Sequence, residues 1–159
     1  MHMDEETQTN LYYVALMHDC GKIGVDDAIL RKPGKLTKEE FDQIKAHTTI
    51  GYEILKNFTA IPDIRDGAHY HHERYDGNGY PEGLKGNEIP LFARIICIAD
   101  SYDAMSSKRC YRDPFPADIT IEELRSNAGR QFDPDIVQYM IDMINDGFTG
   151  SVLKAFEAS

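Results

Sequence analysis

The chain has 159 residues, of which 42% are hydrophobic and 28% are charged, and this composition predicts one globular domain over residues 1–159. Its 27 acidic residues outnumber the 17 basic ones and give a formal net charge of −10, which excludes a broad basic surface for a nucleic-acid duplex. The longest apolar run, Leu11 to Met17, is far shorter than the roughly 18 residues that span a bilayer. We therefore expect a cytoplasmic protein whose cysteines, Cys20, Cys97 and Cys110, are free thiols.

Helical spacing of apolar residues recurs along the chain, and no segment alternates with the period of two that marks a strand. The predicted helices run from about Glu5 to Gly21, Thr37 to Asn57, Asp63 to Arg74, Pro90 to Met105, from Thr120 onward, and Asp133 to Asn145. Thr37 with Glu40 and Thr120 with Glu123 match capping boxes, which mark helix starts. The pair Asp133-Pro134 supplies an N-cap and a first-turn proline for the last helix.

Residues 75–88 carry four glycines and one proline, and we expect them to form a loop rather than a regular element. The whole pattern predicts an all-α, single-domain bundle of about five to seven helices with one glycine-rich loop.

Four of the predicted helices place an ionisable residue on the stripe that should face the core. These residues are His18, His47, the pair His71 and His72, and Asp100. Each is costly to bury alone, and a lone helical histidine is more often a hydrogen-bonded core residue than a ligand. The joint pattern favours a metal site, because imidazole and carboxylate are ligands of Mn, Fe, Zn and Ni ions and a carboxylate such as Asp19 can bridge two of them.

Other polar residues nearby have simpler interpretations. We expect His69 to be exposed, Glu73 to brace the glycine-rich loop, and Arg74 to form a structural ion pair. Residues 1–3, Met-His-Met, are interpreted as left over from cloning.

Four motifs follow one another over about residues 11–145. They are His18-Asp19-Cys20-Gly21-Lys22, HHERYDGNGYP at residues 71–81, IADSYDAM at residues 98–105, and QFDP at residues 131–134. With these motifs the chain resembles the HD-GYP branch of the HD-domain metal-dependent phosphohydrolases. The resemblance implies a helical HD-type bundle that hydrolyses the bacterial messenger cyclic di-GMP to pGpG, GMP or both.

The resemblance also implies two divalent ions, Fe, Mn or similar, with a third in the full-length protein, and attack by a hydroxide that bridges two ions. Ligands of the first ion are matched by His18, Asp19 and Asp100, and ligands of the second by Asp19, His47, His71 and His72.

Substrate contacts are implied for residues in three segments. Lys22 matches a lysine that meets a phosphate, and with Asp19 it would form the catalytic pair. Gly79, Tyr80 and Pro81 form the loop that names the family, and the Tyr80 ring could stack on a guanine. Arg109 and Arg112 fall where basic residues of the family approach the substrate.

One family feature has no match in residues 1–17, namely an earlier helix that adds a further histidine to the first metal. We therefore expect the chain either to lack this helix as a piece of a longer protein, or to be a member with a reduced first metal site. The resemblance also implies an upstream sensory or receiver domain. Two alternatives remain open: a phosphohydrolase of another cyclic dinucleotide or nucleotide, and a non-catalytic module that binds cyclic di-GMP or a protein such as a diguanylate cyclase. The Gly79-Tyr80-Pro81 motif favours cyclic di-GMP as the substrate, whereas the missing histidine favours the non-catalytic module.

Overall fold

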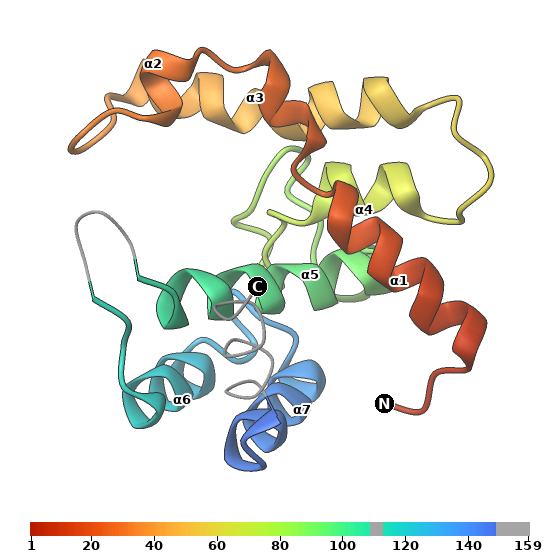
Figure 1. The fold of residues 1–159 in the computed structure, drawn as a ribbon, viewed down its shortest axis with the longest axis vertical. Coiled ribbons are helices and arrows are strands. Elements are labelled where there is room, and N and C mark those ends of the chain that lie inside the picture. The colour runs from red at the N-terminus through yellow and green to blue at the C-terminus, as the bar shows by residue number, and fades with distance from the viewer. Residues whose placement is uncertain (109–112, 149–159) are drawn as a thin grey trace, which may run out of the picture.

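The computed structural model describes residues 1–108 and 113–148, and its regular elements in these ranges are all helical (Figure 1). The helices are α1 (Glu5–Met17), α2 (Asp27–Leu30), α3 (Lys38–Leu55), α4 (Ile64–Tyr70), α5 (Leu91–Ser106), α6 (Ala117–Ser126) and α7 (Pro134–Asn145), with short 3₁₀ helices η1 (Cys20–Gly24) and η2 (Gly86–Glu88). The prediction of an all-α bundle is confirmed.

Helix α5 crosses the middle of the domain and separates two hydrophobic cores (Figure 1). On one side it packs with α6 and α7 around Cys97, Ile98, Leu124, Phe132, Ile136, Val137 and Ile141. On the other side it packs with α1, α4 and the end of α3 around Val14, Leu55, Ile64, Ala68, Phe92 and Ile96. Because both cores depend on α5, a residue on this helix is held firmly relative to α1, α4, α6 and α7.

The segment after α1 packs tightly against α3 because one residue there has no side chain. A Cβ added to Gly21 would lie 1.9 Å from the carbonyl oxygen of His47 and 2.5 Å from the backbone nitrogen of Gly51. Only glycine permits this approach, which brings Asp19, at the start of η1, next to His47 on α3.

Several predicted helix boundaries are confirmed. The Thr37–Glu40 capping box forms, since the Glu40 amide donates to Thr37 Oγ1 at 3.3 Å and the Thr37 amide donates to Glu40 Oε2 at 2.7 Å. Asp133 caps α7 by accepting a hydrogen bond from the Asp135 amide at 2.9 Å. The glycine-rich segment is a loop interrupted only by η2.

The capping box predicted at Thr120 is wrong. Helix α6 begins one turn earlier, after Pro116, and Thr120 is buried inside it with its hydroxyl donating to the Pro116 carbonyl at 3.1 Å. Pro116 is the N-cap of α6, with a φ of −55°, and Ala117 is the first helical residue. The third predicted helix is also shorter than expected, because it turns at His71, after Tyr70, into the loop.

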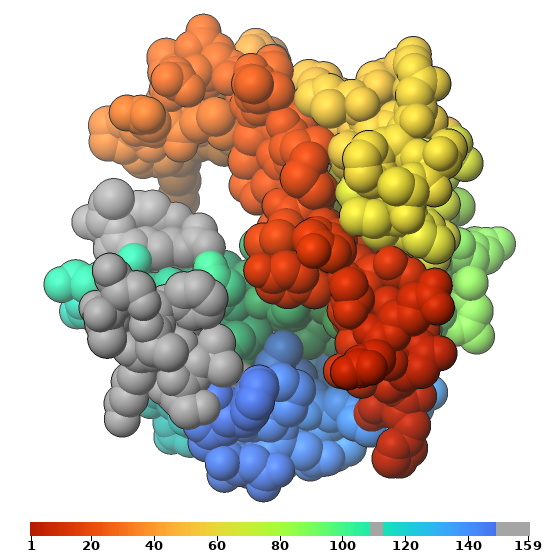
Figure 2. Space-filling model, turned by 45° about the vertical axis from the view of Figure 1, so that its right-hand side comes forward, coloured from red at the N-terminus to blue at the C-terminus, as the bar shows by residue number. Residues whose placement is uncertain are grey.

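Helix α1 lies on the outside of the domain, and the surface is hollowed between the orange segment at α2 and α3 and the green segment at α5 (Figure 2). Across residues 1–108 and 113–148, every helix is too short or too polar to cross a membrane.

Candidate metal centre

Five of the predicted ligands converge from three regions of the chain: His18 and Asp19 between α1 and η1, His47 on α3, and His71 and His72 at the end of α4. Asp19 Oδ2 lies 3.3 Å from His18 Nε2, and Asp19 Oδ1 lies 3.4 Å from His47 Nε2 and 3.8 Å from His71 Nε2. The Nε2 atoms of His47 and His71 are 3.2 Å apart. One carboxylate therefore faces three imidazoles.

Three of these rings are oriented by the backbone through their other nitrogen. The Nδ1 atoms of His18, His47 and His71 lie 2.6, 2.6 and 3.0 Å from the carbonyl oxygens of Ala15, Ile44 and Ala68, respectively. A carbonyl oxygen only accepts, so each Nδ1 carries the proton and each Nε2 is the atom that can hold a metal. Such backbone contacts fix the ring orientation of metal-ligating histidines.

The residues present fit a divalent ion. Asp19 Oδ1 is buried and has no hydrogen-bond donor within the described part of the chain. Around it lie the Nε2 atoms of His47 and His71, which also act as acceptors when their Nδ1 atoms are protonated. Two sets of potential ligand atoms each lie within 4.8 Å of one another, namely His47, His71 and His72, and His18, Asp19 and His71. A cation would turn this cluster of acceptors into a satisfied ligand set.

Burial keeps the central imidazoles neutral. It is the largest influence on His47, His71 and His72, and it lowers the pKa of each. The pKa of His72 falls to about 4, and the charges of neighbouring histidines lower that of His71 further. Neutral imidazole is the form that binds a metal, so the rings are ready as ligands at neutral pH.

Asp19 stays ionised in the same environment. Burial, the largest influence, raises its pKa, but hydrogen bonds from His18 and Lys22 together outweigh burial and hold the pKa of Asp19 well below its usual value. For His18, burial lowers the pKa, yet its hydrogen bond to Asp19 and the nearby carboxylates raise it overall.

Lys22 is predicted to meet a phosphate, and the structure places its Nζ on Asp19 Oδ2. It therefore lies directly beside the cluster. Asp100 is not within either set of ligand atoms but lines the cavity next to them, and its charge acts on His18 and Tyr80. Arg109 and Arg112 lie outside the described residues.

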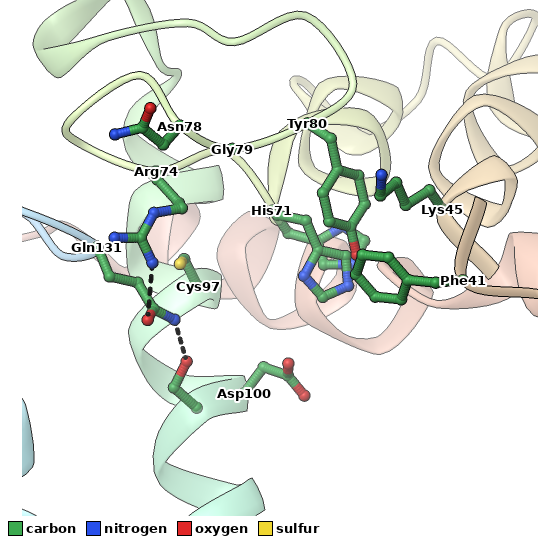
Figure 3. A pocket seen from close by; sticks show the side chains of 12 residues that line it. Phe41, Lys45, His71, Arg74, Asn78, Gly79, Tyr80, Cys97, Asp100 and Gln131 are labelled. Atoms are coloured by element: carbon green, nitrogen blue, oxygen red, sulfur yellow. Dashed lines mark hydrogen bonds between the residues drawn. The ribbon is translucent and has the colours of Figure 1, made fainter. Parts of the chain in front are cut away.

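A cavity of about 340 Å³ opens beside the histidines, between α3, the glycine-rich loop and α5 (Figure 3). It is lined by Phe41, Lys45, His71, His72, Arg74, Asn78, Gly79, Tyr80, Cys97, Asp100, Ser101 and Gln131. Gly79 and Tyr80 of the predicted substrate loop thus reach the cavity, whereas Pro81 is exposed beyond its lining residues.

The loop is fixed at Tyr80. Its ring stacks on His72, with ring centres 4.9 Å apart and planes 28° apart. A Cβ on Gly79 would lie 2.3 Å from the Arg74 backbone nitrogen, so this close approach requires glycine. The buried Glu73 side chain accepts hydrogen bonds from the amides of Glu82 and Gly83 at 2.7 and 2.9 Å, which confirms that it braces the loop.

Two other interpretations of polar residues are tested by the structure. Arg74 forms the expected structural ion pair, 2.8 Å from Asp76. His69 is buried, so the expectation that it is exposed is wrong. Because α4 packs on α3, the His69 ring lies against Tyr52, and its Nδ1 is 3.3 Å from the Thr48 carbonyl oxygen.

Several cavity residues are missed by the sequence interpretation. Phe41 has the spacing of a core residue on α3, yet 44% of it is exposed at the cavity. Lys45, one turn later, and Gln131 of the QFDP motif also line the cavity. Lys45 shares a helix face with Phe41, but the sequence carries no signal that either residue lines a cavity.

Comparison with models of known protein families identifies the family of the chain. The family model for the HD domain matches residues 1–136. The chain belongs to the HD-domain family. Membership of this family implies divalent metal binding, in agreement with the two sets of ligand atoms.

Curated relatives confirm the resemblance to the HD-GYP branch. The chain is 44% identical over 146 residues to a cyclic di-GMP phosphodiesterase of Thermotoga maritima, covering 90% of this chain and 39% of that protein. It is 43% identical over 142 residues to a cyclic di-GMP phosphodiesterase response regulator of Xanthomonas campestris, covering 87% of this chain and 37% of that protein. A 3'3'-cGAMP-specific phosphodiesterase of Vibrio cholerae is 40% identical over 128 residues, covering 79% of this chain and 24% of that protein.

The fold is shared with a crystal structure of a cyclic GMP-AMP specific phosphodiesterase of Vibrio cholerae, with a TM-score of 0.71 at 20% identity. That similarity covers 99% of this chain and 43% of the other. The chain thus spans well under half the length of these relatives.

Proposed function

We propose that this chain is a metal-dependent phosphodiesterase that hydrolyses cyclic di-GMP to pGpG, GMP or both. The observation that carries the proposal is the convergence of Asp19 with the ring nitrogens of His18, His47 and His71 beside a cavity that also presents the Tyr80 ring. The names of the Thermotoga and Xanthomonas relatives support cyclic di-GMP as substrate.

Two divalent ions, Fe, Mn or similar, when bound by His18, Asp19, His47, His71, His72 and Asp100, would supply Lewis acidity and a water of lowered pKa. Asp19 would be held as an ionised ligand by Lys22, whose Nζ contacts it. The same Lys22 would place positive charge beside the phosphoryl group as negative charge builds on its oxygens.

Substrate binding would be shared among residues around the cavity. Gly79 and Pro81 would shape the loop so that Tyr80 can pack against a guanine. Arg109 and Arg112 are proposed as further contacts to substrate because of their positions in the sequence.

The test is hydrolysis of cyclic di-GMP by the chain loaded anaerobically with Mn(II) or Fe(II), with pGpG and GMP separated by chromatography. Asp19→Asn should lower the rate on the order of 100-fold or more, because the negative charge of the ligand is lost. Asp118→Asn, at an exposed position in the first turn of α6, is the matched control and should keep the rate. Equal rates for Asp19→Asn and wild type would refute the proposed site.

A second candidate substrate is 3'3'-cGAMP, because relatives with this printed specificity are about as similar to the chain as the cyclic di-GMP enzymes. Rates on both dinucleotides under identical metal loading would separate the two. Binding of cyclic di-GMP without turnover would instead favour the non-catalytic module.

We also propose a bacterial cytoplasmic location and an upstream sensory or receiver domain in the parent protein. The Xanthomonas relative is named a response regulator, and the chain covers 37% of it.

A further inference from the structure

Three cavity residues form a group that the metal chemistry does not use. Lys45 Nζ lies 4.8 Å from the centre of the Phe41 ring and 5.8 Å from the centre of the Tyr80 ring. The two rings meet edge to face, with centres 6.3 Å apart and planes 81° apart. We call Phe41, Lys45 and Tyr80 the aromatic corner (Figure 3).

The aromatic corner is held in place before any ligand arrives. Tyr80 is stacked on His72, and the loop that carries it is fixed by the close approach at Gly79. Phe41 and Lys45 are one turn apart on α3, and the Lys45 ammonium is tethered by Asp42 at 2.8 Å. A ligand therefore meets two ring surfaces with a cation close to both.

The Lys45 ammonium has hydrogen-bond donors beyond the one that Asp42 accepts. Among the described residues that line the cavity, Lys45 and Arg74 carry positive charge. Arg74 donates through Nε and Nη2 to Asp76 and through Nη1 to Gln131, so its guanidinium is engaged by the protein. An ammonium has three donors, and Asp42 takes one from Lys45.

We propose that the aromatic corner recognises one guanine base of a cyclic dinucleotide, with the purine packed against Phe41 and Tyr80 and Lys45 Nζ donating to O6 and N7. This inference rests on the proposed cyclic-dinucleotide substrate. Aromatic stacking accepts any base, but a lysine donor distinguishes guanine from adenine, because guanine presents O6 and N7 acceptors where adenine presents an amino donor beside N7. Lys45 is therefore assigned as a specificity-determining residue.

The experiment is calorimetric binding of non-hydrolysable phosphorothioate analogues of cyclic di-GMP and cyclic di-AMP to the metal-loaded chain. Wild type should bind the guanine analogue at least about 10-fold more tightly than the adenine analogue. Lys45→Met keeps the apolar stem and should lose most of this preference by weakening only the guanine analogue, whereas Lys45→Arg should retain it. Phe41→Leu should weaken both analogues to a similar extent, because stacking is tolerant of the base.

Lys56→Met is the matched control. Lys56 forms an ion pair with Glu53 of the same helix, three residues back, at 2.6 Å, as Lys45 does with Asp42 at 2.8 Å, but Lys56 is not among the residues that line the cavity. This control should keep the wild-type preference.

Equal weakening of both analogues by Lys45→Met would assign Lys45 to a phosphate and overturn the inference, as would failure of wild type to bind either analogue. Hydrolysis is scored separately. A guanine preference that depends on Lys45, without turnover of cyclic di-GMP, would sustain the inference and refute the proposed activity. Turnover of cyclic di-GMP with the same guanine preference in wild type and Lys45→Met would sustain the activity and refute the inference.

Discussion

Binding of divalent metal should stabilise this chain strongly, because the structure buries a carboxylate oxygen and two imidazole nitrogens that face one another with no donor among the described residues. Asp19 Oδ1 has no hydrogen-bond partner there, and His47 Nε2 lies 3.2 Å from His71 Nε2. A metal present at 100 times its dissociation constant adds about 2.7 kcal/mol to the free energy of unfolding. For a domain of this length, each kcal/mol raises the Tm by roughly 2 to 4 °C, so loading should raise the Tm by roughly 5 to 10 °C.

The assay is scanning calorimetry of the chain after chelation and after reloading with Mn(II), with bound metal measured in the same samples. His71 belongs to both sets of ligand atoms, so His71→Asn should remove most of the rise. His69→Asn is the control, because His69 is also buried, two residues away, but belongs to neither set. A wild-type chain that binds metal without a change in Tm, or a His71→Asn variant that keeps the full rise, would refute this reasoning.

Three further predictions concern the scaffold around the site. Arg94→Met should lower the free energy of unfolding, measured in urea, by about 3 kcal/mol. The reason is that the buried Asp133 carboxylate loses the guanidinium that lies 2.6 Å from it, and a loss under about 1 kcal/mol would contradict this. Gly79→Ala should lower the free energy of unfolding by about 1 to 3 kcal/mol and reduce binding of cyclic di-GMP, because its Cβ would lie 2.3 Å from a backbone atom. Gly24→Ala should cost less stability, because its Cβ would meet only a side chain that can move. Similar losses of stability for the two variants in thermal melts would contradict this prediction. A hydrogen bond from Arg74 lowers the pKa of Asp76 from 3.8 to about 2. The contribution of the Asp76 carboxylate to the free energy of unfolding is therefore present above pH 3.8 and is lost as the pH falls toward 2. Asp76→Asn should therefore cost on the order of 1 to 2 kcal/mol at pH 6 and little near pH 2, and an equal cost at both pH values in urea titrations would refute the assignment.

The histidine cluster could be predicted from the sequence because an ionisable side chain on a core-facing stripe needs a partner, and His18, His47 and His71 all have this position. The structure brings them together with Asp19. The start of α6 was misjudged because a capping pair can also occur inside a helix, and Pro116 determines the start instead.

The aromatic corner could not be predicted in the same way. Helical spacing places Phe41 on the apolar stripe of α3, but spacing alone does not tell which element faces each part of the stripe. Near Phe41 that element is the glycine-rich loop, whose path depends on contacts far apart in sequence, such as the Asp76 amide donating to the Arg130 carbonyl at 2.7 Å. The burial of His69 was missed for the same reason, because it depends on the packing of α4 against α3.

The charge of the chain constrains how an anionic ligand can bind at this cavity. The net charge is −10, and of the two cations among the described lining residues Arg74 is neutralised by Asp76 at 2.8 Å. Asp100 adds negative charge to the same cavity. Lys45 is likewise paired with Asp42 at 2.8 Å, so attraction of a dinucleotide that carries two phosphates must come mainly from the bound divalent ions. The acidic surface then disfavours longer nucleic acids, whose further phosphates would extend beyond the reach of these ions, and thereby favours a small, compact ligand.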